Sequence, residues 1–452
     1  MNILVIGVGK IGTAILESLA NEGHDVTVLD ENPDVISDVT NLYDVIGVCG
    51  GAADCEALEE ASVADAELVI ATTSSDELNM LSCFIAKKMG ARHTIARIRN
   101  PKYNDRNLGF MRQQLDLSYS INPELLTARE LFNLLKLPSA TKVDTFSVKD
   151  FEMIELKLKP DSALIGVSLS DMRSRFKAQF LICAVERNGE AYIPDGNFKL
   201  ESGDTICLTA ARTEVTKLLK ELGLLQKQAK NVMILGGSRT AFYLAKMLTS
   251  SGSNVTVIEK NRKYCDELCR ELPKATIINA DGAQREVLIE EGLYSLDAFV
   301  SLTGIDEENI LISSFAHSRK VPKIISKVNR EELIPMAEQL GLECVVSPKT
   351  IIASKVLRYA RALENSVGSS VETLYKIMDG KVEVLEFKVK TTFTSQNIAL
   401  KDLKTKPNIL IAAIFRDRKI IIPSGDDVLI AGDKVIVIAA NQRINTLSDI
   451  LK

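Results

Sequence analysis

The sequence predicts an α/β fold that occurs twice, in which each of two parallel-sheet domains is followed by a small α+β domain. Three observations lead to this prediction. Short apolar runs alternate with segments of helical periodicity, which is typical of parallel strands joined by helical crossovers. A glycine-rich turn follows the first apolar run. The whole arrangement returns about half a chain later, so the 452 residues contain a tandem duplication.

The first glycine-rich turn lies between a strand and a helix. Residues 3–6 are apolar throughout, which indicates a strand buried on both faces, and they lead into a G-x-G-x-x-G pattern. Gly7 permits a tight turn, Gly9 lets a pyrophosphate approach the backbone, and Gly12 lets the helix pack closely on the strand. The helix start would offer unpaired N–H groups to phosphates. The predicted phosphate-binding residues are Gly7, Val8, Gly9, Lys10, Ile11 and Gly12.

A second predicted strand, residues 26–29, ends on Asp30. An acid roughly 20 residues beyond the glycines lies where it can bind the ribose hydroxyls of a dinucleotide. Strand, glycines, helix, strand and acid in this order predict a Rossmann-like nucleotide site, with an empty site on the same fold as the alternative. A carboxylate disfavours a 2′-phosphate, so the sequence favours NAD(H) or an adenosine nucleotide over NADP(H).

The rest of the first parallel-sheet domain continues the alternation. Strands are predicted at residues 43–48, 68–71 and 93–97, and helices at residues 33–42, 55–61 and 79–89. Ligands of such sheets bind at the carboxyl ends of the strands. Thr73, Ser74 and Arg97 fall at strand ends, so we expect them in the same crevice as Gly9 and Asp30.

The repeat places a second site in the other half of the chain. Its predicted residues are Gly236, Gly237, Ser238, Arg239, Thr240 and Glu259. Ser238 replaces the middle glycine and adds a Cβ on the path of the pyrophosphate. Ala241 replaces the third glycine, and Asp281 stands where the first copy has Gly51. The first site is therefore predicted to bind more tightly, or to prefer a different nucleotide.

Each half ends in a smaller module of a different kind. An alternating strand, a short helix and a strand pair precede a Gly-Asp turn, at residues 203–204 and again at 432–433. Linkers are expected around residues 138–140 and 226–230. The predicted domains are residues 1–137, 141–226, 230–366 and 370–452.

Composition limits the alternatives. A net charge of −5 argues against nucleic-acid binding, and the longest apolar runs are far shorter than a membrane span. Eight cysteines without a CxxC pair indicate reduced thiols and no metal site. An NAD-dependent dehydrogenase would need a positioned acid or base, yet the three histidines do not recur in both halves. The sequence contains no GxxxxGK[ST] motif, which argues against ATP hydrolysis. The repeat accounts for every segment, so no basic recognition helix remains for a transcriptional regulator.

The first fingerprint, the following Ala96-Arg97-Ile98-Arg99-Asn100-Pro101 and the small module resemble the regulator-of-potassium-conductance family. Duplication of both modules within one chain resembles the cytoplasmic subunits of Trk potassium uptake systems. This resemblance implies a non-enzymatic subunit that binds NAD(H) or ATP/ADP and gates a Trk-type membrane potassium pore subunit. It also implies a homo-oligomeric ring, a dimer or tetramer, at the inner face of the cell membrane. Binding of cyclic dinucleotides to the small domains stays open.

Two helices late in the parallel-sheet domains are candidates for the contacts of that ring. Residues 125–137 and 351–363 carry Leu and Ile at three- and four-residue spacing, which leaves an apolar stripe on each helix. A partner chain could cover these stripes. The alternative is that each helix packs within its own chain.

Overall fold

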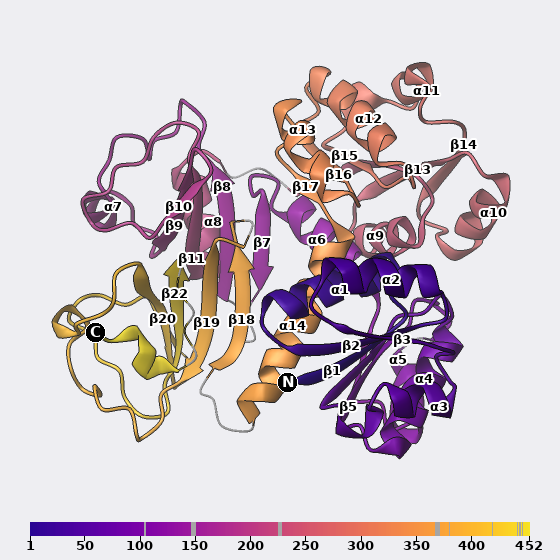
Figure 1. Ribbon diagram of the computed structural model, residues 1–452. Helices are drawn as coiled ribbons and strands as arrows, with labels where there is room; N and C mark the ends of the chain where they lie inside the picture. The colour runs from indigo at the N-terminus through magenta and orange to yellow at the C-terminus, as the bar shows by residue number, and fades with distance from the viewer. Residues whose placement is uncertain are drawn as a thin grey trace. The chain divides into compact units, whose positions relative to one another are not determined.

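The computed structural model describes the chain apart from residues 104, 146–150, 225–227, 367–370, 379, 418, 441, 443 and 445 (Figure 1). The chain forms two compact units. The first unit contains Met1–Phe132 and Lys230–Ala360, and the second contains Asn133–Ala229 and Arg361–Lys452. Each unit therefore combines the corresponding parts of both copies of the repeat.

The first copy supplies a parallel six-stranded sheet to the first unit, with strand order β3-β2-β1-β4-β5-β6. Its strands are β1 (Asn2–Ile6), β2 (Asp25–Asp30), β3 (Ile46–Cys49), β4 (Leu68–Ala71), β5 (His93–Arg97) and β6 (Tyr119–Ile121). Its helices are α1 (Lys10–Asn21), α2 (Pro33–Leu42), α3 (Cys55–Glu60), α4 (Asp76–Met89), α5 (Asp105–Gln114) and α6 (Pro123–Lys136). The strand order reverses between β1 and β4, which is where such sheets bind their ligands.

The second copy repeats this sheet with strand order β14-β13-β12-β15-β16-β17. The strands are β12 (Asn231–Leu235), β13 (Asn254–Glu259), β14 (Thr276–Asn279), β15 (Ala298–Ser301), β16 (Lys323–Lys327) and β17 (Val345–Val346). The helices are α9 (Arg239–Ser250), α10 (Arg262–Glu271), α11 (Arg285–Glu290), α12 (Asp306–Ser318), α13 (Ile334–Gln339) and α14 (Pro348–Ser366). All strand pairs in both sheets are parallel, which confirms the predicted fold class for this unit.

The second unit contains two antiparallel five-stranded sheets, ordered β10-β9-β11-β8-β7 and β18-β19-β22-β20-β21. The first consists of β7 (Lys142–Thr145), β8 (Phe151–Lys157), β9 (Leu181–Arg187), β10 (Glu190–Tyr192) and β11 (Thr205–Ala211), with helices α7 (Leu169–Arg175) and α8 (Arg212–Glu221). The second consists of β18 (Val371–Ile377), β19 (Val382–Lys388), β20 (Ile409–Arg416), β21 (Lys419–Ile421) and β22 (Lys434–Ala440). These are the predicted small α+β modules, extended by the edge strands β7 and β18.

The two Gly-Asp turns do more than reverse the chain. The carboxylate of Asp204 is buried and accepts two hydrogen bonds of 2.8 Å from the guanidinium of Arg187. Asp433 is paired with Arg416 in the same way, at 2.9 and 2.7 Å. A two-pronged contact of this kind fixes direction as well as distance. Each turn is therefore fixed to a strand of its own sheet by a buried aspartate.

The late helices α6 and α14 bury the apolar faces that were candidates for contacts with another chain. Leu131 and Leu134 of α6 are at most 1% exposed, and so are Ile352 and Val356 of α14. Hydrophobic side chains in such positions are already removed from water. These parts of the two stripes are therefore covered within this chain, which favours the alternative that each helix packs within its own chain. Throughout the described residues, every helix is too short or too polar to cross a membrane.

Candidate functional site

The first glycine-rich turn brings three different demands together. A Cβ on Gly7 would lie 2.8 Å from the backbone nitrogen of Thr73, and the φ of Gly7 is +83°. A Cβ on Gly12 would lie 2.1 Å from the carbonyl oxygen of Gly7. By contrast, a Cβ on Gly9 would have no atom within 4 Å. Two glycines are thus required by the fold, whereas Gly9 keeps a space open in front of the N-terminus of α1.

Asp30 holds this turn against the end of β2. Its carboxylate accepts a hydrogen bond of 2.8 Å from the backbone nitrogen of Val8 and one of 3.0 Å from that of Asn32. An ionised carboxylate has about four acceptor positions, so two remain for ribose hydroxyls. Asp30 therefore stabilises the turn and also keeps the capacity that its predicted role requires. In the helix that follows, Lys10 is exposed and Ile11 is half-buried.

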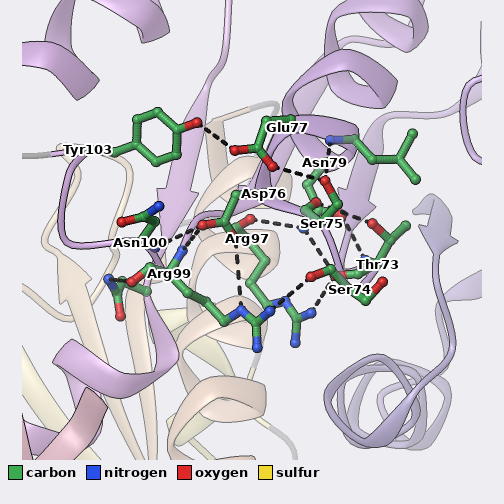
Figure 2. Close-up of polar contacts among 12 residues, drawn as sticks. Thr73, Ser74, Ser75, Asp76, Glu77, Asn79, Arg97, Arg99, Asn100 and Tyr103 are labelled. Carbon is green, nitrogen blue, oxygen red and sulfur yellow. Dashed lines mark hydrogen bonds and ion pairs between the residues drawn. The ribbon is translucent and has the colours of Figure 1, made fainter. Parts of the chain in front are cut away.

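Thr73, Ser74 and Arg97 lie together at the carboxyl ends of β4 and β5 (Figure 2). Thr73 and Arg97 are held by Asn79, a fully buried residue that the sequence reasoning missed. The Asn79 side chain accepts a hydrogen bond from the Thr73 nitrogen at 2.7 Å and donates one to the Arg97 carbonyl at 2.9 Å. Asn79 therefore connects the two strand ends.

Asp76, in the first turn of α4, completes the connection (Figure 2). One carboxylate oxygen accepts hydrogen bonds from the backbone nitrogens of Arg99 and Asn100, at 2.9 and 2.8 Å. We call Asp76 and Asn79 the strand-end bracket. The N-cap residue Ser75, whose hydroxyl accepts from the Leu78 nitrogen at 3.1 Å, is the sequence signal that could have placed this helix start.

Arg97 and Arg99, at and just after the bracketed end of β5, donate hydrogen bonds to the loop after β4. The Arg97 guanidinium donates to the carbonyl of Thr73, and that of Arg99 donates to the carbonyl of Ser74 at 2.8 Å. Arg97 is only 9% exposed, and its Nε has no hydrogen-bond partner among the described residues. Burial lowers the pKa of Arg97, and the neighbouring Arg99 lowers it further. A buried arginine whose Nε donor is unused favours an anion.

A third cation comes from the other copy. Arg239, the first residue of α9, also lowers the pKa of Arg97, whereas Glu124 raises it. Burial raises the pKa of Glu124 itself, and Arg99, Arg239 and Arg97 act in the opposite direction. In the second copy, the residue that corresponds to Glu124 is Lys349. Because Arg239 comes from the second copy and Glu124 lies far along the chain from Arg97, neither Glu124 nor the grouping of the cations could be seen in the sequence.

The strand-end bracket recurs in the second copy. The Asn309 side chain accepts from the Thr303 nitrogen at 2.9 Å and donates to the Lys327 carbonyl at 3.0 Å. Asp306 accepts from the backbone nitrogens of Asn329 and Arg330, each at 2.9 Å. The two copies thus hold their strand ends with identical residues and matching hydrogen bonds.

A cavity of about 320 Å³ lies at the carboxyl ends of the second sheet. Among the predicted residues, Gly236, Gly237, Ser238 and Glu259 line this cavity. Arg239 and Thr240 are not part of its lining, and Thr240 is buried. Further lining residues that the sequence reasoning did not assign to the site include Lys260, Tyr264 and Glu308. Its volume falls within the range of small-molecule sites.

The turn of this second site differs from the first in its helix cap and matches it in the hydrogen bonds of its acid. The hydroxyl of Ser238 accepts a hydrogen bond of 3.3 Å from the Ala241 nitrogen and so caps α9. The carboxylate of Glu259 accepts from the backbone nitrogens of Gly237 and Asn261, both at 2.6 Å. Ser238 therefore uses a helix N–H that stays available in the first copy.

Two parallel-sheet domains with glycine-rich turns, alternating with two antiparallel modules, define a tandem regulatory-type architecture. The model of the TrkA-N domain matches residues 3–111 and 232–348, and that of the TrkA-C domain matches residues 153–223 and 385–452. The chain is 31% identical to the Trk system potassium uptake protein TrkA homolog of Archaeoglobus fulgidus over the full length of both chains. It is 28% identical to the Trk system potassium uptake protein TrkA of Haemophilus influenzae, covering 98% of this chain and 96% of the relative. The chain therefore belongs to the TrkA family.

Solved structures share the architecture. The crystal structure of the GsuK RCK domain superposes with a TM-score of 0.64 at 18% identity, covering 97% of this chain and 92% of that one. The GsuK channel bound to NAD gives the same TM-score and identity, with 97% and 77% coverage. At this identity the likeness concerns the fold alone.

Proposed function

We propose that this chain is the peripheral regulatory subunit of a Trk-type potassium uptake system and that it binds NAD(H), ATP or ADP. Family membership over the full chain supports the transport role, because the relatives are named Trk system potassium uptake proteins. The ligand class is supported by the two glycine-rich turns. GsuK, which shares the fold, has been captured with NAD and with ADP.

In the first site, the pyrophosphate of the ligand would lie over Gly9, at the open N-terminus of α1. The ribose of the adenosine half would meet the free acceptor positions of Asp30. Further phosphates would face the arginines at the carboxyl end of β5. The observation that carries this proposal is the buried Arg97, whose Nε has no partner among the described residues, beside Arg99 and Arg239. The bound nucleotide supplies negative charge there and needs no catalytic step.

The same cluster suggests how occupancy is transmitted. Arg97 belongs to the first parallel-sheet domain and Arg239 to the second, so an anion between them would attract both. The strand-end bracket connects the Arg97 backbone to the start of α4, so a displacement of Arg97 should move the ends of β4 and β5 together. A ligand shifts such an equilibrium only by its difference in affinity for the two arrangements. We propose that this shift gates the pore subunit, with the chain assembled as a homo-oligomeric ring on the cytoplasmic face of the membrane.

The experiment is a thermal-unfolding titration of the full chain with NAD⁺, NADH, ATP and ADP. A specific ligand at a hundredfold excess over its Kd should stabilise the protein by about 2.7 kcal/mol. The Gly9→Leu variant should fold normally, because a Cβ there would have no atom within 4 Å, and should lose binding at the first site. Unchanged unfolding with all four nucleotides would refute the proposal. Consumption of NADH with carbonyl substrates would instead favour an oxidoreductase.

A further inference from the structure

The cavity of the second copy has a strongly acidic lining. Three carboxylates contribute to it, those of Glu259, Asp281 and Glu308. Lys260 is the one lysine or arginine among the lining residues. We propose that this cavity selects its ligand by charge and prefers the oxidised dinucleotide NAD⁺ to NADH and to ATP. This inference rests on the proposed function, and it assigns a different ligand preference to each copy.

Most of the acidic character is particular to the second copy. Counting from the shared aspartates of the bracket, Glu308 corresponds to Leu78 of the first copy. Asp281 corresponds to Gly51, as the aligned third strands show. Of the three carboxylates, only Glu259 therefore has an acidic counterpart, Asp30. The second site has gained two acids on a scaffold that otherwise matches the first.

The basic groups of the second copy do not compensate for these acids. Arg239 and Lys327 are not among the residues lining the cavity. Arg239 stabilises Glu124 in its ionised form. Burial lowers the pKa of Lys327, whereas Asp306 and Glu124 act in the opposite direction. The cations that could receive extra phosphates thus lie with the arginines of the first copy.

Of the three carboxylates, Glu308 should determine the ligand preference, because its charge is not used by a described residue. Glu259 already binds two backbone nitrogens, and Asp281 accepts one hydrogen bond of 3.0 Å from the nitrogen of Ala283. Glu308 forms no hydrogen bond or ion pair with any residue that the structure describes, and it is only partly exposed. Its negative charge is therefore available to a ligand.

The position of Glu308 indicates which part of the ligand it meets. A dinucleotide spans the point where the strand order reverses, here between β12 and β15. Glu259 and Asp281 follow β13 and β14, on the adenosine side. Glu308 lies in the first turn of α12, after β15, and so faces the nicotinamide half of a dinucleotide or the terminal phosphates of ATP. The nicotinamide ring is cationic in NAD⁺ and neutral in NADH, whereas the terminal phosphates are anionic.

The experiment measures binding to the second site alone, by calorimetry on the Gly9→Leu background. A unit charge within about 7 Å should favour NAD⁺ over NADH by about three- to eightfold in this partly solvated setting. ATP should bind more weakly than either dinucleotide. Glu308→Gln should abolish the preference, while Glu290→Gln, an exposed acid outside the cavity, should preserve it.

A reciprocal variant tests whether the residue suffices. In the double variant Leu78→Glu/Glu308→Gln, with Gly9 unaltered, the preference for NAD⁺ should move to the first site. Equal affinities for NAD⁺ and NADH on the Gly9→Leu background would overturn the inference, as would a preference that survives Glu308→Gln. Tighter binding of ATP that depends on Mg²⁺ would also overturn it, because the carboxylates would then hold a cation. Absence of nucleotide binding in the unaltered chain would instead refute the proposed function.

Discussion

The two parallel-sheet domains differ in a selective way: they share their internal supports and diverge where a ligand would lie. Asn79 and Asn309 make corresponding hydrogen bonds between two strand ends, at 2.7–3.0 Å. By contrast, Gly9 of the first copy corresponds to Ser238 of the second, which caps its helix. A buried polar support is costly to change because its loss leaves backbone groups unpaired. Ligand-facing positions carry no such cost in the free protein.

The contacts between turn and acid show how divergence was accommodated. In the first copy, Val8 is buried and its nitrogen donates to the short side chain of Asp30. In the second copy, a Cβ on Gly237 would lie 2.9 Å from the Cγ of Glu259. The longer acid therefore occupies the space that a side chain has in the first copy. The two substitutions form one compensating pair and preserve the same hydrogen bond.

The largest expected effect removes a shared support. Replacing Asn79 or Asn309 by Leu deprives a partly buried backbone N–H and the backbone C=O at the next strand end of their partner. We expect a loss of about 2–5 kcal/mol in the free energy of unfolding for each variant, because each orphaned group costs about 1–3 kcal/mol. Urea denaturation measures this loss, and Asn41→Leu, at an exposed position, serves as the control. A large effect in only one copy would show that the supports are not equivalent.

The sequence predicts the strands and helices of the parallel-sheet domains better than it predicts the hydrogen bonds of the strand-end bracket. The predicted bounds of β4, β5 and α2 agree with the structure, because each is a short apolar run or a periodic segment between clear turn signals. The sequence predicts the start of α4 at Asn79, three residues after its actual start at Asp76, so of the two bracket residues only Asp76 lies outside the predicted helix. Its hydrogen bonds to the end of β5 join residues 18 to 24 apart along the chain, and such pairings depend on the finished fold.

The second prediction concerns Asp30, the acid of the first fingerprint. We expect Asp30→Ala to weaken nucleotide binding at the first site by about tenfold or more, because a hydrogen bond to a charged group contributes about 1.5–3 kcal/mol. The variant also loses the acceptors of Val8 and Asn32, so a modest loss of stability should accompany the weaker binding. Calorimetry on the folded variant tests the role, with Asp30→Asn as the conservative control. Unchanged affinity would remove Asp30 from the site.

The third prediction tests close packing in the turn. In Gly12→Ala the new methyl group would approach the Gly7 carbonyl oxygen to 2.1 Å, so the helix must shift. We expect a loss of about 1–3 kcal/mol in the free energy of unfolding, as for other overpacked positions. The second copy already carries a fully buried Ala241 at this position, and there Ala241→Gly should cost only about 0.5–1 kcal/mol. Thermal unfolding of both variants compares them, and equal losses would mean that the two turns have the same packing.

The variants with the smallest expected effect on stability, at Gly9 and Ser238, test ligand binding separately from folding. Gly9→Ala adds a methyl group in open space, on a backbone with φ −72°, so the stability of the free protein should not change. The methyl group should nevertheless weaken nucleotide binding at the first site, because the pyrophosphate would need that space. Ser238→Gly removes a helix cap, which typically costs a few tenths of a kcal/mol, and releases the Ala241 nitrogen for a phosphate. Binding at the second site should therefore strengthen. Stoichiometry and affinity are measured by calorimetry for each variant separately. Intact binding in Gly9→Ala combined with a sharp change in Ser238→Gly would reverse the proposed order of the two sites.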